Sequence, residues 1–208
     1  MTKPILYGAD YSVYVRIARM ALEEKGIDYE LVPVDIFAAE GIPAWYLELH
    51  PFARIPAFEH EGFRLFETGA IARYVNEAFD GPALQPADAR GRARMGQMTG
   101  MLDAYGYRAM VWDVAVERLE KAEPDEILIA GGLSKAETVL EVLTSLKANG
   151  PWLLGDQLTL ADLHAAPVIA YFVKVIEGQK LLARFAEIRD WYARVVERPS
   201  FVRTEKVG

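Results

Sequence analysis

A proline at the start of a predicted strand is the feature that most constrains this fold. Pro56 follows Ile55 and opens an apolar stretch over 56–59. Because proline has no N–H to give to a ladder, it belongs at a sheet edge or in a special turn. A cis peptide bond is one way to make such a turn, and for X–Pro it costs only about 0.5–1 kcal/mol relative to trans. We therefore expect a cis bond here, with the main chain of Ile55 facing outward to pair with a peptide.

A second feature lies ten residues further on, where Glu67 and Thr68 precede a run with helical spacing: Ile71, Tyr74, Val75 and Ala78. Thr68 is predicted to be the N-cap of that helix, and a helix N-terminus attracts a carboxylate. Glu67 beside it can pair with an ammonium group. An outward-facing backbone, a carboxylate and a helix N-terminus together predict a receptor for the amino-acid-like end of a small peptide.

The first 79 residues alternate between strand and helix patterns. Strands are predicted over 4–8, 29–34, 56–59 and 63–66, and helices over 12–25, 44–49 and 68–78. A strand, a helix and a strand within about 30 residues favour parallel pairing, and Glu61-Gly62 predicts a hairpin. The order β-α-β-α-β-β-α resembles the thioredoxin fold, whose cis-proline turn would be Ile55-Pro56.

The rest of the chain has helical patterns only. Gly81 and two prolines mark residues 80–87 as a linker. Helices are predicted over 88–121, where four glycines weaken the pattern, and over 134–147 and 178–196. Thr159 with Asp162 three residues later predicts a capping box, which has a structural role.

These motifs carry a family resemblance. An aromatic residue before Ile-Pro, a hairpin, and then Phe66-Glu67-Thr68-Gly69-Ala70-Ile71 resemble the glutathione-binding half of the glutathione S-transferases. The resemblance extends over nearly the whole chain, and it is nearest to cytosolic, serine-type, bacterial-like members. It implies a thioredoxin-like α/β domain over 1–79, a linker over 80–87, and an all-α helical domain over 88–208.

The resemblance implies that the enzyme must activate the thiol of glutathione. A thiol with a pKa near ~8.5 is mostly neutral at pH 7, whereas the nucleophile is the thiolate. Ser12 stands where a hydroxyl donor and a helix N-terminus are both available to lower that pKa. The segment Ser12-Val-Tyr-Val-Arg16 also resembles the serine-type motif. Two alternatives stay open: Ser12 is only an N-cap, or Tyr7 serves instead, as in the tyrosine branch of the family.

The resemblance assigns the other site residues. Arg54, Ile55, Pro56, Glu67 and Thr68 would bind glutathione, and Tyr11, Met101 and Tyr105 would line a pocket for a small apolar electrophile. Gly41-Ile42 stand where a His-Lys pair usually holds the glycine carboxylate of glutathione, so Arg54 would take over part of that role. For each apolar helical residue, ordinary core packing is the alternative.

Composition restricts the class of function. The net charge of −7 argues against nucleic acid and membrane surfaces as partners. The chain has no cysteine, which excludes disulfides and any mechanism with a protein thiol. Its three histidines lack metal-like spacing and are interpreted as ordinary polar residues. With no long apolar run and no leader, a cytoplasmic protein is expected.

Three classes of function remain. The first is glutathione transfer, the second is another reaction of the same thiolate (isomerisation, dehalogenation or ether cleavage), and the third is a non-catalytic binding module. The resemblance also implies a homodimer, in which the first domain of one chain packs on the second domain of the other. Phe52 is the expected apolar contact.

Overall fold

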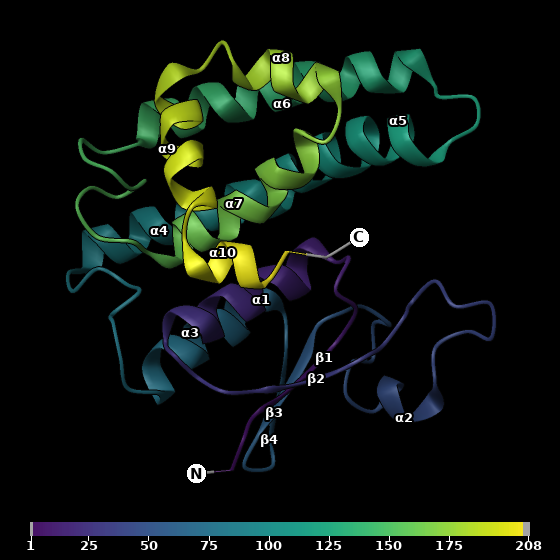
Figure 1. The fold of residues 1–208 in the computed structure, drawn as a ribbon, viewed down its shortest axis with the longest axis vertical. Coiled ribbons are helices and arrows are strands. Elements are labelled where there is room, and N and C mark those ends of the chain that lie inside the picture. The colour runs from purple at the N-terminus through teal and green to yellow at the C-terminus, as the bar shows by residue number, and fades with distance from the viewer. Residues whose placement is uncertain (1, 206–208) are drawn as a thin grey trace. The chain divides into compact units, whose positions relative to one another are not determined.

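The computed structural model describes residues 2–205, which divide into two compact units. The first unit contains residues 2–83 and 199–205, and the second contains residues 84–198. The first is built on a sheet, and the second is helical (Figure 1). The fold class expected from the sequence is confirmed.

The first unit has a four-stranded sheet in the order β2-β1-β3-β4. Its strands are β1 (Ile5–Tyr7), β2 (Glu30–Val32), β3 (Ala57–His60) and β4 (Phe63–Phe66). β1 pairs in parallel with β2 and antiparallel with β3, and β3 and β4 form an antiparallel hairpin. The parallel pairing and the hairpin predicted from the sequence are therefore confirmed.

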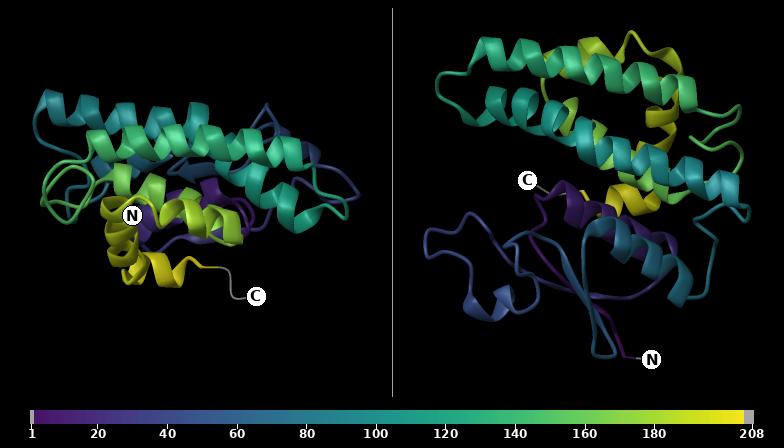
Figure 2. Two further views of the ribbon diagram at one scale, coloured as in Figure 1. Left: turned by 90° about the horizontal axis from the view of Figure 1, so that it is seen from above. Right: turned by 180° about the vertical axis from the view of Figure 1, so that it is seen from behind.

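Four helices belong to the first unit: α1 (Val13–Glu24), α2 (Ala44–Leu47), α3 (Thr68–Ala78) and α10 (Pro199–Arg203). α1 and α3 lie side by side on one face of the sheet (Figures 1 and 2). On that face, Phe58 of β3 meets Tyr74 of α3 with ring centroids 5.9 Å apart. On the opposite face, Tyr7 of β1 meets Trp45 of α2 with centroids 6.0 Å apart. The alternation of strand side chains thus separates the two faces.

The segment after Arg198 belongs with the first unit, although the sequence prediction placed it in the helical domain over 88–208. Arg16 of α1 lies over the Phe201 ring at 3.9 Å and donates to the Phe201 carbonyl at 3.0 Å. The Ser200 hydroxyl donates to Glu24. These contacts join α10 to α1 through residues far apart in the sequence, which is why local patterns did not indicate them.

The second unit consists of α4 (Ala89–Met101), η1 (Leu102–Gly106), η2 (Arg108–Val116), α5 (Glu117–Glu120), α6 (Glu126–Leu146), α7 (Leu160–Phe172), α8 (Ile176–Leu182) and α9 (Ala186–Val196). The stretch from α4 to α5 runs on as one helical segment despite its four glycines. Its middle is π-helical, with i→i+5 bonds such as Tyr107 N–H to the Leu102 carbonyl. None of the helices within residues 2–205 combines the length and apolarity needed to span a bilayer.

α6 begins eight residues before its predicted start, at Glu126 rather than Ser134. The Asp125 side chain accepts from the amides of Ile127 and Leu128 and so caps the helix. Gly131 and Gly132 weakened the sequence pattern. Gly132 is required by packing, because a Cβ there would lie 2.8 Å from Val114 Cγ2 and 3.1 Å from the Ala109 carbonyl oxygen.

The predicted capping box at the start of α7 is confirmed. One Asp162 oxygen accepts from the amide of Thr159 at 2.8 Å and from its hydroxyl at 2.9 Å. The other accepts from the Leu153 amide and from Trp191 Nε1, each at 2.8 Å. This carboxylate therefore joins three segments of the second unit, as well as capping a helix.

Candidate active site

The first element of the site is the N-terminus of α1. Ser12 has the extended backbone of an N-cap, and its side-chain oxygen accepts from the Val15 amide at 3.3 Å. This bond uses the oxygen as an acceptor, so the hydroxyl hydrogen stays available to a ligand. The capping role is confirmed, and the predicted catalytic role is compatible with it.

The end of β1 brings that helix start close to the proline loop. A Cβ on Gly8 would lie 2.4 Å from Val15 Cγ2 and 3.5 Å from the Cβ of Ile55. A side chain at this position would therefore collide with Val15 of α1, and Ile55 of the loop would be in van der Waals contact with it. In the sequence Gly8 indicated only the end of a strand, so its second role was missed.

The loop before β3 contains the predicted cis peptide bond between Ile55 and Pro56. The Tyr46 hydroxyl, from α2, donates to the Arg54 carbonyl at 2.7 Å and accepts from the Ala57 amide. Tyr46 is fully buried, and this burial raises the pKa of its hydroxyl. One side chain thus fixes both ends of the loop. No sequence pattern indicated this role for Tyr46.

The start of α3 differs from the prediction. Thr68 is the first residue of the helix, and Glu67 holds the cap position with φ 70° and ψ 111°. The prediction of Thr68 as N-cap was wrong because the chain leaves β4 and enters α3 through a sharp left-handed turn at Glu67. Thr68 is 6% exposed, and its hydroxyl donates to the Tyr14 carbonyl at 3.4 Å.

Within residues 2–205, no side chain caps α3. Glu67 and Gly69 are exposed, and a Cβ on Gly69 would meet nothing within 4 Å. The first turn therefore presents amide groups and a partial positive charge, which suits a carboxylate. The neighbouring Glu67 carboxylate suits an ammonium group.

Three of the predicted elements therefore come together in the first unit. Gly8 places Ile55 beside the first turn of α1, and the bond from Thr68 to Tyr14 joins α3 to the same turn. Ser12 caps that turn. Arg54 is exposed on the loop, where it can reach a ligand.

The Tyr11 hydroxyl is engaged by the protein, where it donates to an Asp35 oxygen at 2.6 Å. Burial and this hydrogen bond raise the pKa of the Tyr11 hydroxyl. The ring lies 6.0 Å from that of Phe37, which is 63% exposed. Tyr11 therefore offers an apolar ring surface rather than a free hydroxyl, which is what its predicted role requires.

Tyr7 points away from the start of α1. Its ring meets Trp45 on the sheet face opposite α1 and α3. Burial, with the nearby Glu59 carboxylate, raises the pKa of the Tyr7 hydroxyl. The geometry thus favours Ser12 over Tyr7 as the hydrogen-bond donor to the thiol.

Met101 and Tyr105 belong to the second unit. Met101 ends α4 and is half-buried, and Tyr105 lies in η1 with 66% exposure. Their assignment to the electrophile stays a prediction.

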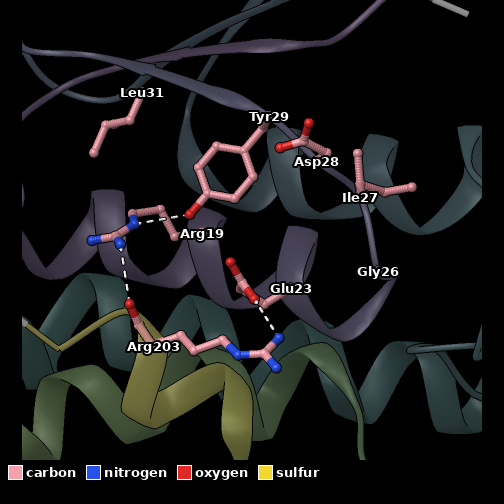
Figure 3. A pocket seen from close by; sticks show the side chains of 8 residues that line it. All are labelled: Arg19, Glu23, Gly26, Ile27, Asp28, Tyr29, Leu31 and Arg203. Atoms are coloured by element: carbon pink, nitrogen blue, oxygen red, sulfur yellow. Dashed lines mark hydrogen bonds and ion pairs between the residues drawn. The ribbon is translucent and has the colours of Figure 1, made fainter.

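A pocket of about 500 Å³ lies elsewhere in the first unit, between α1, the segment leading into β2, and α10 (Figure 3). Arg19 donates to the Tyr29 hydroxyl at 3.0 Å and to the Arg203 carbonyl at 3.3 Å. Arg203 pairs with Glu23 at 3.3 Å. Because these charged groups serve protein partners and none of the predicted site residues lines the pocket, we assign it a structural role.

A sheet with a cis-proline loop and an uncapped helix start, followed by a helical unit, is the arrangement that the family resemblance implied. Residues 6–83 match the family described as glutathione S-transferase, N-terminal domain, and residues 104–199 match its C-terminal domain. The chain is 30% identical to glutathione S-transferase 1 of Zea mays over 200 residues, covering 94% of this chain and 92% of that protein.

Other relatives agree. Glutathione S-transferase F13 of Arabidopsis thaliana is 28% identical over 204 residues, covering 95% of this chain and 93% of the relative. The structure of a glutathione S-transferase-I bound with lactoylglutathione superimposes with a TM-score of 0.85 at 26% identity, covering 98% of both chains. This chain belongs to the glutathione S-transferase family. Its curated relatives named above are plant proteins, and the expectation of a bacterial-like, serine-type member stays a prediction.

Proposed function

We propose that this protein activates the thiol of glutathione, with Ser12 as the hydrogen-bond donor, for attack on a small apolar electrophile. One observation carries the assignment. Ser12 uses its oxygen to cap α1, so its hydroxyl hydrogen lies at the positive end of a 12-residue helix. A donor and a helix N-terminus both favour a thiolate over a thiol.

The remaining contacts follow from the chemistry of the peptide. Glu67 would hold the ammonium of the γ-glutamyl end, and the open first turn of α3 would hold its carboxylate. Ile55 would pair through its main chain with the cysteinyl part. Arg54 would bind the glycine carboxylate, since no histidine or lysine stands at Gly41-Ile42.

In the reaction the sulfur forms a bond to the electrophilic carbon. When the electrophile carries a leaving group, that group departs with the bonding electrons, and the thiol proton passes to solvent. The Ser12 hydroxyl stabilises the thiolate by donating a hydrogen bond to the sulfur, and it keeps its own proton. The protein contributes orientation and a lower thiol pKa. Tyr11 is proposed to provide apolar contact to the electrophile.

Isomerisation, dehalogenation and ether cleavage begin with the same thiolate, so they remain the second candidate. A binding module without catalysis is the third, because a fold can persist without its activity. We also propose a homodimer working in the cytoplasm. Support comes from the family and from the exposed apolar ring of Phe52.

Two measurements test this function. Retention on immobilised glutathione, with elution by free glutathione, is expected and separates the glutathione-dependent candidates from a module that kept the fold without binding glutathione. A panel of aryl halides, unsaturated carbonyl compounds, organic hydroperoxides and aryl ethers, followed by product identification, then distinguishes transfer from the other reactions. A protein that binds glutathione but turns over none of these would leave only the binding role.

A further inference from the structure

His50 is buried beside the glutathione-binding residues, although its sequence context indicated only an ordinary polar residue. It lies in the loop after α2 and is 3% exposed. Its ring stacks on Phe66, the residue before Glu67, with centroids 4.9 Å apart and planes at 36°. Phe52 meets the same imidazole edge-on at 6.4 Å.

Within the described part of the chain, one nitrogen of the imidazole is buried without the polar partner that such atoms usually have. Its Nδ1 atom is buried and makes no hydrogen bond to any of residues 2–205. Tyr46, the third ring around it, gives its hydroxyl to the proline loop instead. Aromatic rings solvate a neutral imidazole far better than an imidazolium with an unpartnered nitrogen.

Two charged groups act on His50 from the surrounding elements: the Glu67 carboxylate after β4 and the Arg54 guanidinium from the proline loop. Burial, the largest effect, lowers the pKa of His50; the Glu67 carboxylate and the polar backbone of His50 itself raise it, and Arg54 lowers it. The net direction is below the ordinary value of 6.5. Its surroundings therefore favour the neutral imidazole more than water does.

We propose that His50 is a positioning residue for glutathione binding: as a neutral ring it supports Phe66 and so the direction of Glu67, and when protonated it competes with the ligand ammonium for the Glu67 carboxylate. This inference rests on the proposed function. It adds a dependence on pH that the contacts of Ser12, Glu67 and Ile55 do not contain by themselves.

The direction in which glutathione affinity changes with pH follows from the linkage between proton binding and ligand binding. A ligand ammonium at Glu67 neutralises the carboxylate that favours the imidazolium, so binding should expel a proton from His50. Affinity is then full above the pKa of His50 in the free protein and is lost as the pH falls through that value. Unperturbed carboxylates titrate near ~4, so they contribute little to a change in affinity between pH 7.5 and 5.5.

The first test is calorimetric titration with glutathione at pH 7.5 and 5.5. We expect the wild-type affinity to be lower at pH 5.5 than at pH 7.5, and His50→Gln to lose this dependence while binding within about threefold of wild type at pH 7.5. His60→Gln is the matched control, because His60 is also buried in this unit but is bonded to Tyr74. It should keep the wild-type pH dependence. A dependence that persists in His50→Gln would overturn the proposal.

The second test needs neither glutathione nor a stable His50 variant. The imidazole C2–H resonance of His50, assigned by comparison with His60→Gln and His164→Asn, should titrate below pH 6.5. Glu67→Gln should lower that pKa further, because it removes the carboxylate that favours the charged form. An unchanged pKa in Glu67→Gln would refute the coupling. Absence of glutathione binding at pH 7.5 would instead refute the proposed function.

Discussion

At the scale of single residues, the site depends on side chains that do two things at once. Ser12 caps a helix with its oxygen and keeps a hydrogen to donate. Tyr46 holds both ends of the proline loop through one hydroxyl. Such residues link stability to ligand binding, because the group that fixes the backbone also fixes the direction of the next group along the chain.

Glu67 allows a direct test of glutathione placement. Glu67→Ala should weaken glutathione binding by about 1.5–3 kcal/mol, the loss of a charge-assisted bond. Isothermal titration calorimetry measures this loss. Glu61→Ala is the matched control, because Glu61 is likewise exposed and has a positive φ (53° against 70°). Equal affinity for Glu67→Ala and wild type would show that the ammonium site is misplaced.

Some residue roles can be recognised from the neighbouring sequence, and others depend on contacts that form only in the folded protein. Ser12 and Pro56 stand in motifs that carry their own chemistry, so the sequence indicated both. Tyr46 and His50 act through contacts with the proline loop and with Phe66. Those contacts exist only after the sheet and α2 have come together, and no spacing in the sequence indicates them.

At the scale of elements, the second unit depends on one buried carboxylate. Asp162→Ala should destabilise the protein by at least about 3 kcal/mol, because it leaves the amides of Leu153 and Thr159 and the Trp191 indole without an acceptor. Asp125→Ala is the comparison, since Asp125 is an exposed N-cap worth about 1 kcal/mol. Urea unfolding followed by circular dichroism would measure both, and similar losses would contradict the account.

Adjacent glycines in α6 predict opposite effects. A methyl group at Gly132 would collide with Val114 and with a backbone carbonyl, so Gly132→Ala should cost about 1–3 kcal/mol. Gly131 has open space, so Gly131→Ala should stabilise the helix by up to about 1 kcal/mol. Differential scanning calorimetry should show melting temperatures moving in opposite directions. A rise in both would mean that α6 packs less closely than described.

Element types were more predictable than element limits. The strands, α1 and α3 are found where the sequence pattern indicated, and the weakly indicated helix over 44–49 is present as α2 over Ala44–Leu47. The start of α6 was missed because Gly131-Gly132 resembles a break, whereas packing against η2 requires the second glycine. The sequence prediction put α10 in the helical domain, because the residues that bind it, Arg16 and Glu24, lie far away in the sequence on α1.

At the scale of the whole molecule, we expect the protein to form a homodimer. Phe52 is 69% exposed, and its ring lies 5.9 Å from that of Phe66, so an apolar surface is open to a second chain. We expect a dimer at micromolar concentration by light scattering, and a shift toward monomer in Phe52→Asp. Phe63→Asp is the control, as another exposed phenylalanine of the same unit. A monomeric wild type would contradict this expectation.

The measurement that tests the central claim most directly is the pH–rate profile of Ser12→Ala beside that of wild type. If the Ser12 hydroxyl stabilises the thiolate, Ser12→Ala should lower kcat by at least about tenfold and raise the pKa of bound glutathione by about one unit. The glutathione affinity should change little, and Tyr7→Phe should behave like wild type. Full activity in Ser12→Ala together with loss of activity in Tyr7→Phe would contradict the assignment.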